Sequence, residues 1–396
     1  MNHWASTGLR ERLAGRKGLR GFRSLFVHSR DLASFELAPE HPFRPERVSK
    51  TIELCARYGL WEKPWMQVGE PFEVDRELLE RFHDPDYLEV LEKASSGIVS
   101  LDTLRRGLGT QDCPVNRGLY QWAKAVVGGT VAAMRALIRG EVDVGVQFYG
   151  GLHHAMPDHA EGFCYLNDIA LAIPEALEAG FKVAYVDCDA HHGNGVQEAF
   201  YRDPRVLVIS IHETGRTLYP WGGFEEQLGE AEGFGYNVNI PLEPASDDEV
   251  FRYAFGAVVR PLLEAFQPDL LVAQLGADAL ISDPLTHLRL TNNGYSWAIS
   301  QMTALGVPIL GLGGGGYDMY RTARCWTLAW AMLNDLEPRD ELAGLVGGMM
   351  FGPEMEVGSL YDAPHPTLGE AKHRAMREVR RVVAFIQEKV FPVHGI

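Results

Sequence analysis

Cysteine is scarce in this chain, and its spacing excludes two kinds of site. The five cysteines stand far apart in the sequence, and no two of them form a CxxC pair: Cys55, Cys113, Cys164, Cys188 and Cys325. An odd number of widely spaced cysteines indicates neither a disulfide framework nor a cysteine-based zinc site. We therefore expect buried free thiols, and the cytoplasm as the compartment.

Long apolar runs and a positive excess of charge are also missing. No stretch predicts a membrane span or an apolar signal core. The formal net charge is -16, whereas a nucleic-acid surface needs a basic patch. We expect neither a membrane partner nor direct nucleic-acid binding. The Arg-rich segment GLRERLAGRKGLRGFRS slightly resembles an organelle presequence, but we interpret residues 1–24 as a solvated basic N-terminal extension.

What the sequence does contain is an alternation of strand and helix patterns. Short β-branched apolar runs, typical of strands buried on both faces, begin near residues 25, 142, 182, 206, 269 and 307. Longer amphipathic stretches lie between them, such as residues 117–140 and 247–266. This alternation predicts an α/β fold with an open parallel sheet and helices on both faces. No repeat or linker divides the chain, so we expect one domain over residues 25–390.

Polar clusters follow several of these runs, where ligand sites of such sheets form. In YVDCDAHHGNG, residues 185–195, Asp187, Asp189 and His191 are spaced to face one pocket. Asp189 and His191 offer oxygen and nitrogen ligands for a divalent metal, and Asp278 in QLGAD is the best candidate for a third. The alternative for an isolated Asp-x-His pair is that it caps the following helix.

Two adjacent histidines, His153 and His154, follow the glycines of YGGL. Beside a metal site they are suited to general acid and base roles, because histidine titrates near neutral pH. Asp187 and Asn194 are placed to orient their second ring nitrogens. The alternative is a pair of buried, hydrogen-bonded core histidines.

The glycine run GGGGYD, residues 313–318, lacks the lysine and spacing of a phosphate-binding loop. We interpret it as a permissive loop that presents Tyr317, whose hydroxyl is able to donate to an oxyanion. Asp112 in TQDCP has the surroundings of a turn residue. Arg47 follows Pro45 at the start of a helical pattern, where a solvated side chain is the simpler interpretation.

Taken together, the motifs resemble the histone deacetylase superfamily, in particular its bacterial class-I-like branch with the acetoin-utilization proteins. The resemblance covers about residues 25–340. The matching pieces occur in family order: HPFRPERV, FHDPDYLEVL, DCPV, GGLHHA, GFCYLNDIALAI, YVDCDAHHGNGVQEAF, SIHE, LYP, QLGADAL, DPL and GGGGYDMYRTARCWT. The resemblance implies an arginase-like single domain built on an eight-stranded parallel sheet.

The resemblance also implies a role for each matching position. Asp189, His191 and Asp278 match the zinc ligands, with iron(II) as a possible replacement in the cell. His154 matches the general base and acid, His153 its partner, Asp187 and Asn194 their orienting residues, and Tyr317 the oxyanion donor. The acyl-lysine tunnel is expected from Gly162, Phe163, Tyr219 and Leu285, with Asp112 on the substrate backbone, Arg47 on the acetate-release channel and His192 behind the site. Structural potassium ions are expected on backbone oxygens near Asp187, Asp189, His191, Ser210 and Ile211, and near Phe200, Asp203, Val206 and Tyr236.

Three positions depart from the class I pattern. Asn194 replaces the aspartate that usually stands behind the second histidine, and a neutral partner raises the pKa of that histidine less. Tyr219 stands where a phenylalanine is usual, and Gln111 stands where class I members often have an aromatic residue. These departures concern the pH profile and substrate preference rather than the reaction type.

The sequence therefore predicts a metal-dependent amidohydrolase that removes acetyl or related short acyl groups from lysine side chains of proteins. An alternative is hydrolysis of an acetylpolyamine or another small acylated amine. A binding module without turnover is disfavoured, because such proteins usually lack a ligand or the tyrosine. A ureohydrolase is disfavoured because its two-metal site needs more ligands.

Overall fold

The computed structural model describes residues 22–61, 63–338 and 360–396. The expected N-terminal extension, residues 1–24, lies outside the described residues except for its last three. The described elements run from Ser24 at the start of the first strand to His394 at the end of the last helical turn.

The described strands form one eight-stranded sheet in which every neighbouring pair is parallel. They are Ser24–Val27 (β1), Met66–Gly69 (β2), Val144–Gln147 (β3), Val183–Asp187 (β4), Val206–Glu213 (β5), Asn237–Leu242 (β6), Leu270–Gln274 (β7) and Ile309–Leu312 (β8). The spatial order is β2-β1-β3-β8-β7-β4-β5-β6. The predicted α/β fold with an eight-stranded parallel sheet is confirmed.

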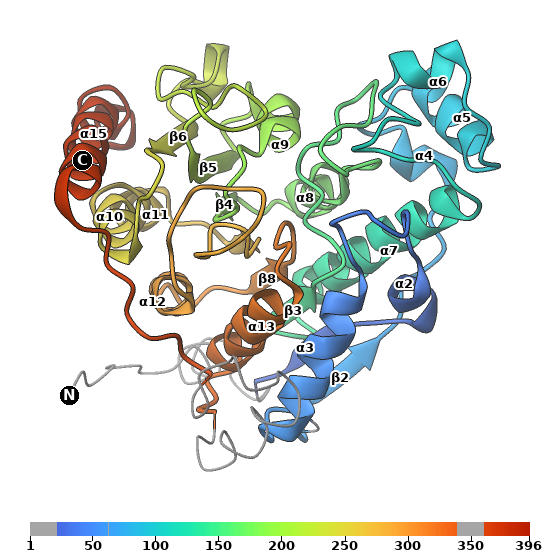
Figure 1. Cartoon of the computed structure of the whole chain (residues 1–396), viewed down its shortest axis with the longest axis horizontal. Helices are drawn as coiled ribbons and strands as arrows, with labels where there is room; N and C mark the ends of the chain where they lie inside the picture. Colours follow the sequence, from blue (N-terminus) through green and yellow to red (C-terminus); the bar gives the residue numbers. More distant parts are fainter. Residues whose placement is uncertain (1–21, 62, 339–359) are drawn as a thin grey trace.

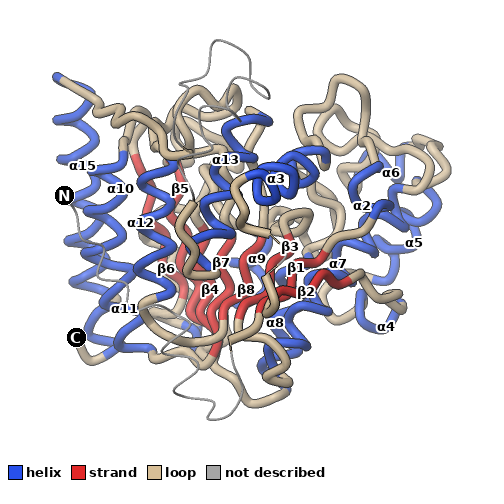
Figure 2. Tube along the Cα trace, turned by 90° about the horizontal axis from the view of Figure 1, so that it is seen from below, coloured by secondary structure: helices blue, strands red, loops and turns tan. Residues whose placement is uncertain are grey.

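Helices cover both faces of this sheet, as Figure 2 shows with α3 and α13 on one side and α8 on the other. The α-helices are Arg30–Ser34 (α2), Glu46–Arg57 (α3), Arg76–Leu79 (α4), Pro85–Ala94 (α5), Leu101–Arg105 (α6), Leu119–Ile138 (α7), Asp168–Glu178 (α8), Asn194–Phe200 (α9), Asp248–Ala254 (α10), Arg260–Phe266 (α11), Asn292–Thr303 (α12), Met319–Leu333 (α13) and Gly369–Lys389 (α15). Other helical turns are Ala231–Gly233 (η1), Phe255–Val259 (η2) and Phe391–His394 (η4). Within the described ranges, no helix is both long and apolar enough to span a membrane.

The two edge strands of the sheet differ in how far they are exposed. The β2 edge is short and half-exposed. The β6 edge is fully buried because the C-terminal helix α15 packs against it (Figure 1). Covering or shortening an edge strand keeps its unpaired backbone groups from pairing with another chain. The central strands β3, β8, β7 and β4 are buried on both faces, which explains their continuous apolar sequences.

Candidate active site

The candidate site lies where the four central strands end. Since β3, β8, β7 and β4 are neighbours and parallel, their carboxyl ends meet at one edge of the sheet. The loop after β3 carries the two histidines, and the loop after β4 carries Asp189 and His191. Asp278 follows β7, and Tyr317 follows β8. One polar centre is therefore assembled from four loops that are far apart in the sequence.

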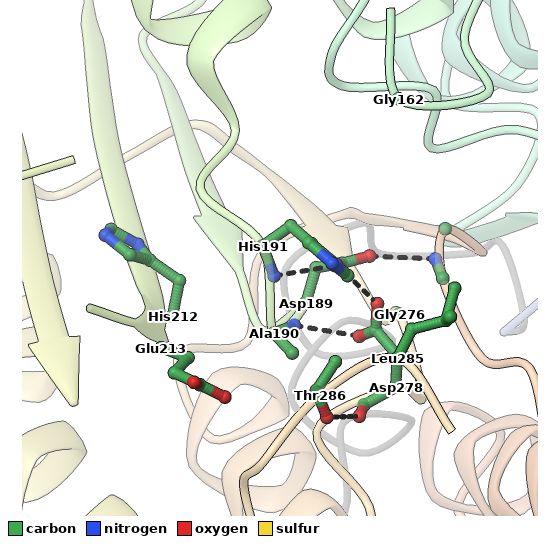
Figure 3. Close-up of polar contacts among 12 residues, drawn as sticks. Gly162, Asp189, Ala190, His191, His212, Glu213, Gly276, Asp278, Leu285 and Thr286 are labelled. Carbon is green, nitrogen blue, oxygen red and sulfur yellow. Dashed lines mark hydrogen bonds and ion pairs between the residues drawn. The ribbon is translucent and has the colours of Figure 1, made fainter. Parts of the chain in front are cut away.

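Asp189, His191 and Asp278 are brought together as the predicted ligand set. Their ligand atoms all lie within 4.8 Å of one another, and all three residues are buried. His191 Nδ1 lies 2.8 Å from Asp278 Oδ2 and 3.2 Å from Asp189 Oδ1 (Figure 3). The helix-capping alternative does not apply, because α9 begins after Gly193 and has no side-chain cap.

Backbone amides hold the two carboxylates in place. The Gly315 amide donates to Asp189 Oδ2 at 2.8 Å, and the Ala190 amide donates to Asp278 Oδ1 at 2.8 Å. The Gln274 side chain donates a further bond to Asp189 Oδ2 at 2.9 Å. Such bonds fix the direction of the oxygens that remain available to a metal.

The charge of the triad fits a cation. Two buried carboxylates face one imidazole, so the group carries an excess of negative charge. Burial acts against a charge on His191, but Asp278 and Asp189 outweigh it and raise the pKa of this histidine to about 10. A site that attracts a proton this strongly at its centre favours a divalent metal there, with the mixed oxygen and nitrogen ligands that zinc accepts.

The two neighbouring histidines form separate hydrogen-bonded pairs. His153 Nδ1 lies 2.7 Å from Asp187 Oδ2, and the Tyr185 hydroxyl donates to the same oxygen at 2.6 Å. His154 Nδ1 lies 2.7 Å from Asn194 Oδ1. The Nε2 atoms of the two rings are 3.1 Å apart. Both predicted orienting residues, Asp187 and Asn194, are therefore in place.

These distances define where the protons lie. Each Nδ1 faces an acceptor oxygen and so carries a proton. One Nε2 must then donate to the other. Burial opposes a charge on His153, yet Asp187 and Asp189 outweigh it and raise the pKa of His153 to about 9. Burial, together with the charges of His153 and His191, lowers the pKa of His154 well below its usual value. His153 is thus the donor of this pair, and His154 is neutral and accepts at Nε2.

Tyr317 and Arg47 lie on the glycine-loop side of the centre. Tyr317 is half-buried, and its amide donates to Asp283 Oδ2 at 2.8 Å. Arg47 is buried, not solvated as its local sequence suggested. Its guanidinium donates to the carbonyls of Gly316 at 2.7 Å and Gly314 at 2.9 Å. Arg47 therefore holds the loop that presents Tyr317.

Gly162, Phe163 and Tyr219, three of the expected tunnel residues, lie close to the histidines. Phe163 and Tyr317 meet edge to face with ring centroids 5.6 Å apart, and Tyr219 meets the His154 ring at 5.2 Å. A small cavity reaches the centre: Phe43, Gly151, Leu152, His153, His154, Gly162, Phe163, Cys164, Asp189, Gly314, Gly315 and Tyr317 line it. Leu285 is half-buried, and its amide donates to Asp283 Oδ1 at 3.0 Å, beside Tyr317.

Asp112 lies at the outside of this wall. It is exposed, and its carbonyl accepts a bond of 3.2 Å from His41 Nε2. The His41 ring in turn packs on the edge of Phe163 at 4.6 Å. His192 is buried beside His212, with ring centroids 4.9 Å apart, behind the triad.

The residues expected near potassium ions fall into two groups. The first group lies at the end of β4 and beside it in β5, where Asp187 pairs with Ser210: Asp187, Asp189, His191, Ser210 and Ile211. In the second group, carbonyls of Phe200, Asp203 and Tyr236 accept backbone bonds from Asp203 at 3.0 Å, Val206 at 3.2 Å and Val208 at 2.8 Å.

Three residues at the centre were not singled out from the sequence. Gln274 and Asp283 hold Asp189 and Tyr317, and Glu161 accepts a hydrogen bond from Asn194 Nδ2. Gln274 and Asp283 are the first residues of QLGAD and DPL, two motifs that carry the family resemblance. Their place in these motifs is the only sequence signal for them. Glu161 precedes GFCYLND and shows its role only through its contact with a loop that follows another strand.

Comparison with known proteins gives a consistent result. The sequence profile described as the histone deacetylase domain matches residues 41–333. The chain is 37% identical over 320 residues to histone deacetylase 9 of Arabidopsis thaliana, covering 80% of this chain and 74% of that protein. It is 36% identical over 322 residues to histone deacetylase B of Dictyostelium discoideum, covering 81% and 76%. Human histone deacetylase 1 is 36% identical over 334 residues, covering 84% and 69%.

Proposed function

This chain belongs to the histone deacetylase family, and from that membership we propose that it is a zinc-dependent amidohydrolase of acyl-lysine side chains. The substrates are acetylated, or similarly short-acylated, proteins of the cytoplasm. The observation that carries this proposal is the buried Asp189, His191 and Asp278 triad beside two separately oriented histidines. Within the family, we propose that the chain belongs to the bacterial class-I-like branch, because its motifs resemble those of that branch and occur in the same order.

Zinc, or iron(II) in its place, would be held by Asp189, His191 and Asp278, and supplies a Lewis acid that polarises the amide carbonyl and acidifies the attacking water. The remaining chemistry belongs to the side chains. His154 accepts the water proton at Nε2, the unprotonated ring nitrogen, which lies 3.1 Å from His153 Nε2. His154 then gives that proton to the departing lysine amine.

Charge developing on the carbonyl oxygen needs donors and positive charge nearby. The Tyr317 hydroxyl donates a hydrogen bond to this oxygen, and His153 in its protonated form would lower the cost of the negative charge. Gly162, Phe163, Tyr219 and Leu285 enclose the lysine stem, and Asp112 holds the substrate backbone. Arg47 lies at the inner end, suited to a leaving carboxylate.

The wider organisation is proposed on the same resemblance. Residues 25–390 form the catalytic domain, preceded by the basic extension of residues 1–24. Potassium ions bound by the two groups of backbone oxygens would stabilise the loop that carries Asp189. Thermal unfolding in potassium and in sodium chloride tests this point, and equal midpoints in the two salts would contradict it.

The experiment that tests the function compares kcat/KM of the zinc-loaded enzyme for an acetyl-lysine peptide and for N-acetylputrescine. An Asp278→Ala variant is the control for the metal site. We expect a strong preference for the peptide and loss of turnover in the control. A preference for N-acetylputrescine would support the same mechanism but identify small acylated amines as the substrates. Failure to hydrolyse any acyl-lysine would refute the proposal.

A further inference from the structure

A tight turn connects the tunnel wall to the histidines. Glu161 and Cys164 exchange backbone hydrogen bonds of 3.2 and 2.9 Å, so residues 161–164 form a two-residue hairpin turn. Its central residues Gly162 and Phe163 both have positive φ, 53° and 67°. This is the backbone of a type I′ turn, and it is unusual for a phenylalanine. The turn directs Gly162 and Phe163 to the cavity and leaves Glu161 at its base.

Glu161 lies at the end of a chain of polar contacts. Its Oε1 accepts a hydrogen bond from Asn194 Nδ2, and its Oε2 lies 3.7 Å from His159 Nε2. The side chain retains only 24% of its exposure. Burial acts to raise the pKa of Glu161, but the donors of His159 and Asn194 outweigh it and lower the pKa. Glu161 is therefore a carboxylate at neutral pH.

An ionised carboxylate only accepts hydrogen bonds. It therefore turns the amide nitrogen of Asn194 toward itself and the amide oxygen toward His154 Nδ1, at 2.7 Å. The reversed amide would place its oxygen against Glu161, so that two acceptors would face each other. It would also force the proton of a neutral His154 onto Nε2, the atom that has to be unprotonated to accept a proton. An asparagine amide is able to face His154 with either its oxygen or its nitrogen, and Glu161 selects the orientation in which the oxygen faces His154.

We propose that Glu161 is a positioning residue for the deacetylation reaction: through the Asn194 amide it holds His154 in the form whose Nε2 accepts a proton. This role rests on the proposed function of the site. Glu161 thus supplies a carboxylate behind Asn194, from the same turn whose Gly162 and Phe163 line the cavity. Because the same turn carries Gly162 and Phe163, the orientation of the proton acceptor is linked to the wall that holds the lysine stem.

Steady-state kinetics of the zinc-loaded enzyme separate this role from a structural one. We expect Glu161→Ala to lower kcat by about tenfold or more, the usual effect of losing a partner behind a catalytic group, with little change in KM. Glu161→Gln keeps an acceptor oxygen for Asn194 but also has a donor NH2 group, so it should recover only part of kcat. Glu178→Gln, at an exposed glutamate of α8, is the matched control and should behave as the wild type.

The effect of Glu161→Ala should differ when it is combined with a substitution of Asn194. In Asn194→Asp the residue behind His154 accepts with both oxygens, so no amide has to be oriented, and Glu161 faces another carboxylate. Glu161→Ala should therefore leave kcat equal or raise it in this background. An equal fractional loss in both backgrounds, an unchanged kcat in the single variant, or an effect on KM alone would overturn the proposal.

A spectroscopic measurement is independent of turnover. In the zinc-loaded protein labelled with 15N-histidine, we expect the ring spectrum of His154 to place its proton on Nδ1. In Glu161→Ala we expect a mixture of both ring forms. The same single form in both proteins would overturn the positioning role even if no acyl-lysine were hydrolysed. Conversely, an inactive wild type with the expected spectra would refute the proposed function alone.

Discussion

At the scale of single residues, Tyr317 illustrates how the site limits the freedom of a catalytic group. Its amide is bonded to Asp283 and its ring meets the edge of Phe163, so both ends of the residue are held. Burial, together with the negative charges of Asp278 and Asp189, raises the pKa of its hydroxyl well above the usual value. The hydroxyl therefore stays protonated at neutral pH and is able to donate a hydrogen bond.

The first prediction concerns the removal of that donor. Tyr317→Phe should lower kcat by roughly 100- to 1000-fold, the loss typical of one oxyanion donor, with KM nearly unchanged. Steady-state assays of the zinc-loaded variant measure this decrease in kcat. Metal analysis should find the same zinc content as in the wild type. Turnover equal to that of the wild type would remove Tyr317 from the mechanism.

The sequence predicts some of these residues better than others. Asp189, His191 and Asp278 are distinguished by residue type and by their position directly after apolar runs. The neighbours of Arg47 left a solvated side chain open, and only the resemblance placed Arg47 in the site. The carbonyls of Gly314 and Gly316 that bind it are more than 260 positions away. Glu161 shows no local pattern at all. Partners that come from distant loops exist only after the strands have been ordered in the sheet.

At the scale of elements, the glycine run after β8 is explained by close approach. A Cβ added at Gly315 would lie 2.1 Å from Asp278 Oδ2 and 3.1 Å from Asp189 Oδ2. Neither carboxylate can move away without leaving its backbone donor. The loop therefore needs glycine at this position in order to bring its backbone against the ligand set.

The second prediction follows from this contact. Gly315→Ala should displace the Asp278 carboxylate and lower both the bound zinc and kcat, as measured by metal analysis and peptide turnover. Gly256→Ala is the matched control, since a Cβ there meets nothing closer than 3.9 Å. A fully zinc-loaded, active Gly315→Ala protein would show that the loop is able to move.

The third prediction concerns the connection between α4 and α5. His83 is buried there, with Nδ1 3.0 Å from the Met156 carbonyl and Nε2 accepting from the Asn167 amide at 3.0 Å. Burial lowers the pKa of His83 to about 4. The unfolded histidine binds a proton below about pH 6.5, whereas the folded one does not until about pH 4. Folding stability is thus lost as pH falls through this window, by up to about 3 kcal/mol from this residue.

Urea unfolding of the wild type and of His83→Asn between about pH 7 and about pH 5 measures this effect. The decrease in the free energy of unfolding should be smaller in the variant. His212, whose pKa burial also lowers to about 4, should account for part of the decrease that remains. Identical slopes in the two proteins would exclude His83 as a source of the pH dependence.

The elements that the sequence missed have weak patterns for physical reasons. β2 is an edge strand of four residues with half-exposed side chains, so it has no apolar run. β6 reads as a polar segment because Asn237 and Asn239 alternate with its apolar residues, and both side chains donate to Gln197 at 2.8 Å. The predicted helix over residues 247–266 is present, but a π-helical turn, η2, lies within it.

At the scale of the whole molecule, the interior holds every cysteine. All five thiols are free and buried, and burial raises the pKa of each of them. The fourth prediction is that a thiol reagent such as DTNB reacts with none of them in the native protein and with all of them in denaturant. Rapid reaction of a native thiol would mean that the core opens locally on the time scale of the assay.

The order of strands has a consequence for how the chain is made. Among the described strands, β1, β2 and β3 form one parallel group and β4, β5 and β6 another, and β7 and β8 lie between them. A growing polypeptide therefore completes two separate half-sheets whose inner edges stay open until the last two strands are synthesised. The loops of those strands bring Asp278 and Tyr317, so closing the sheet and completing the site are the same late event in biosynthesis.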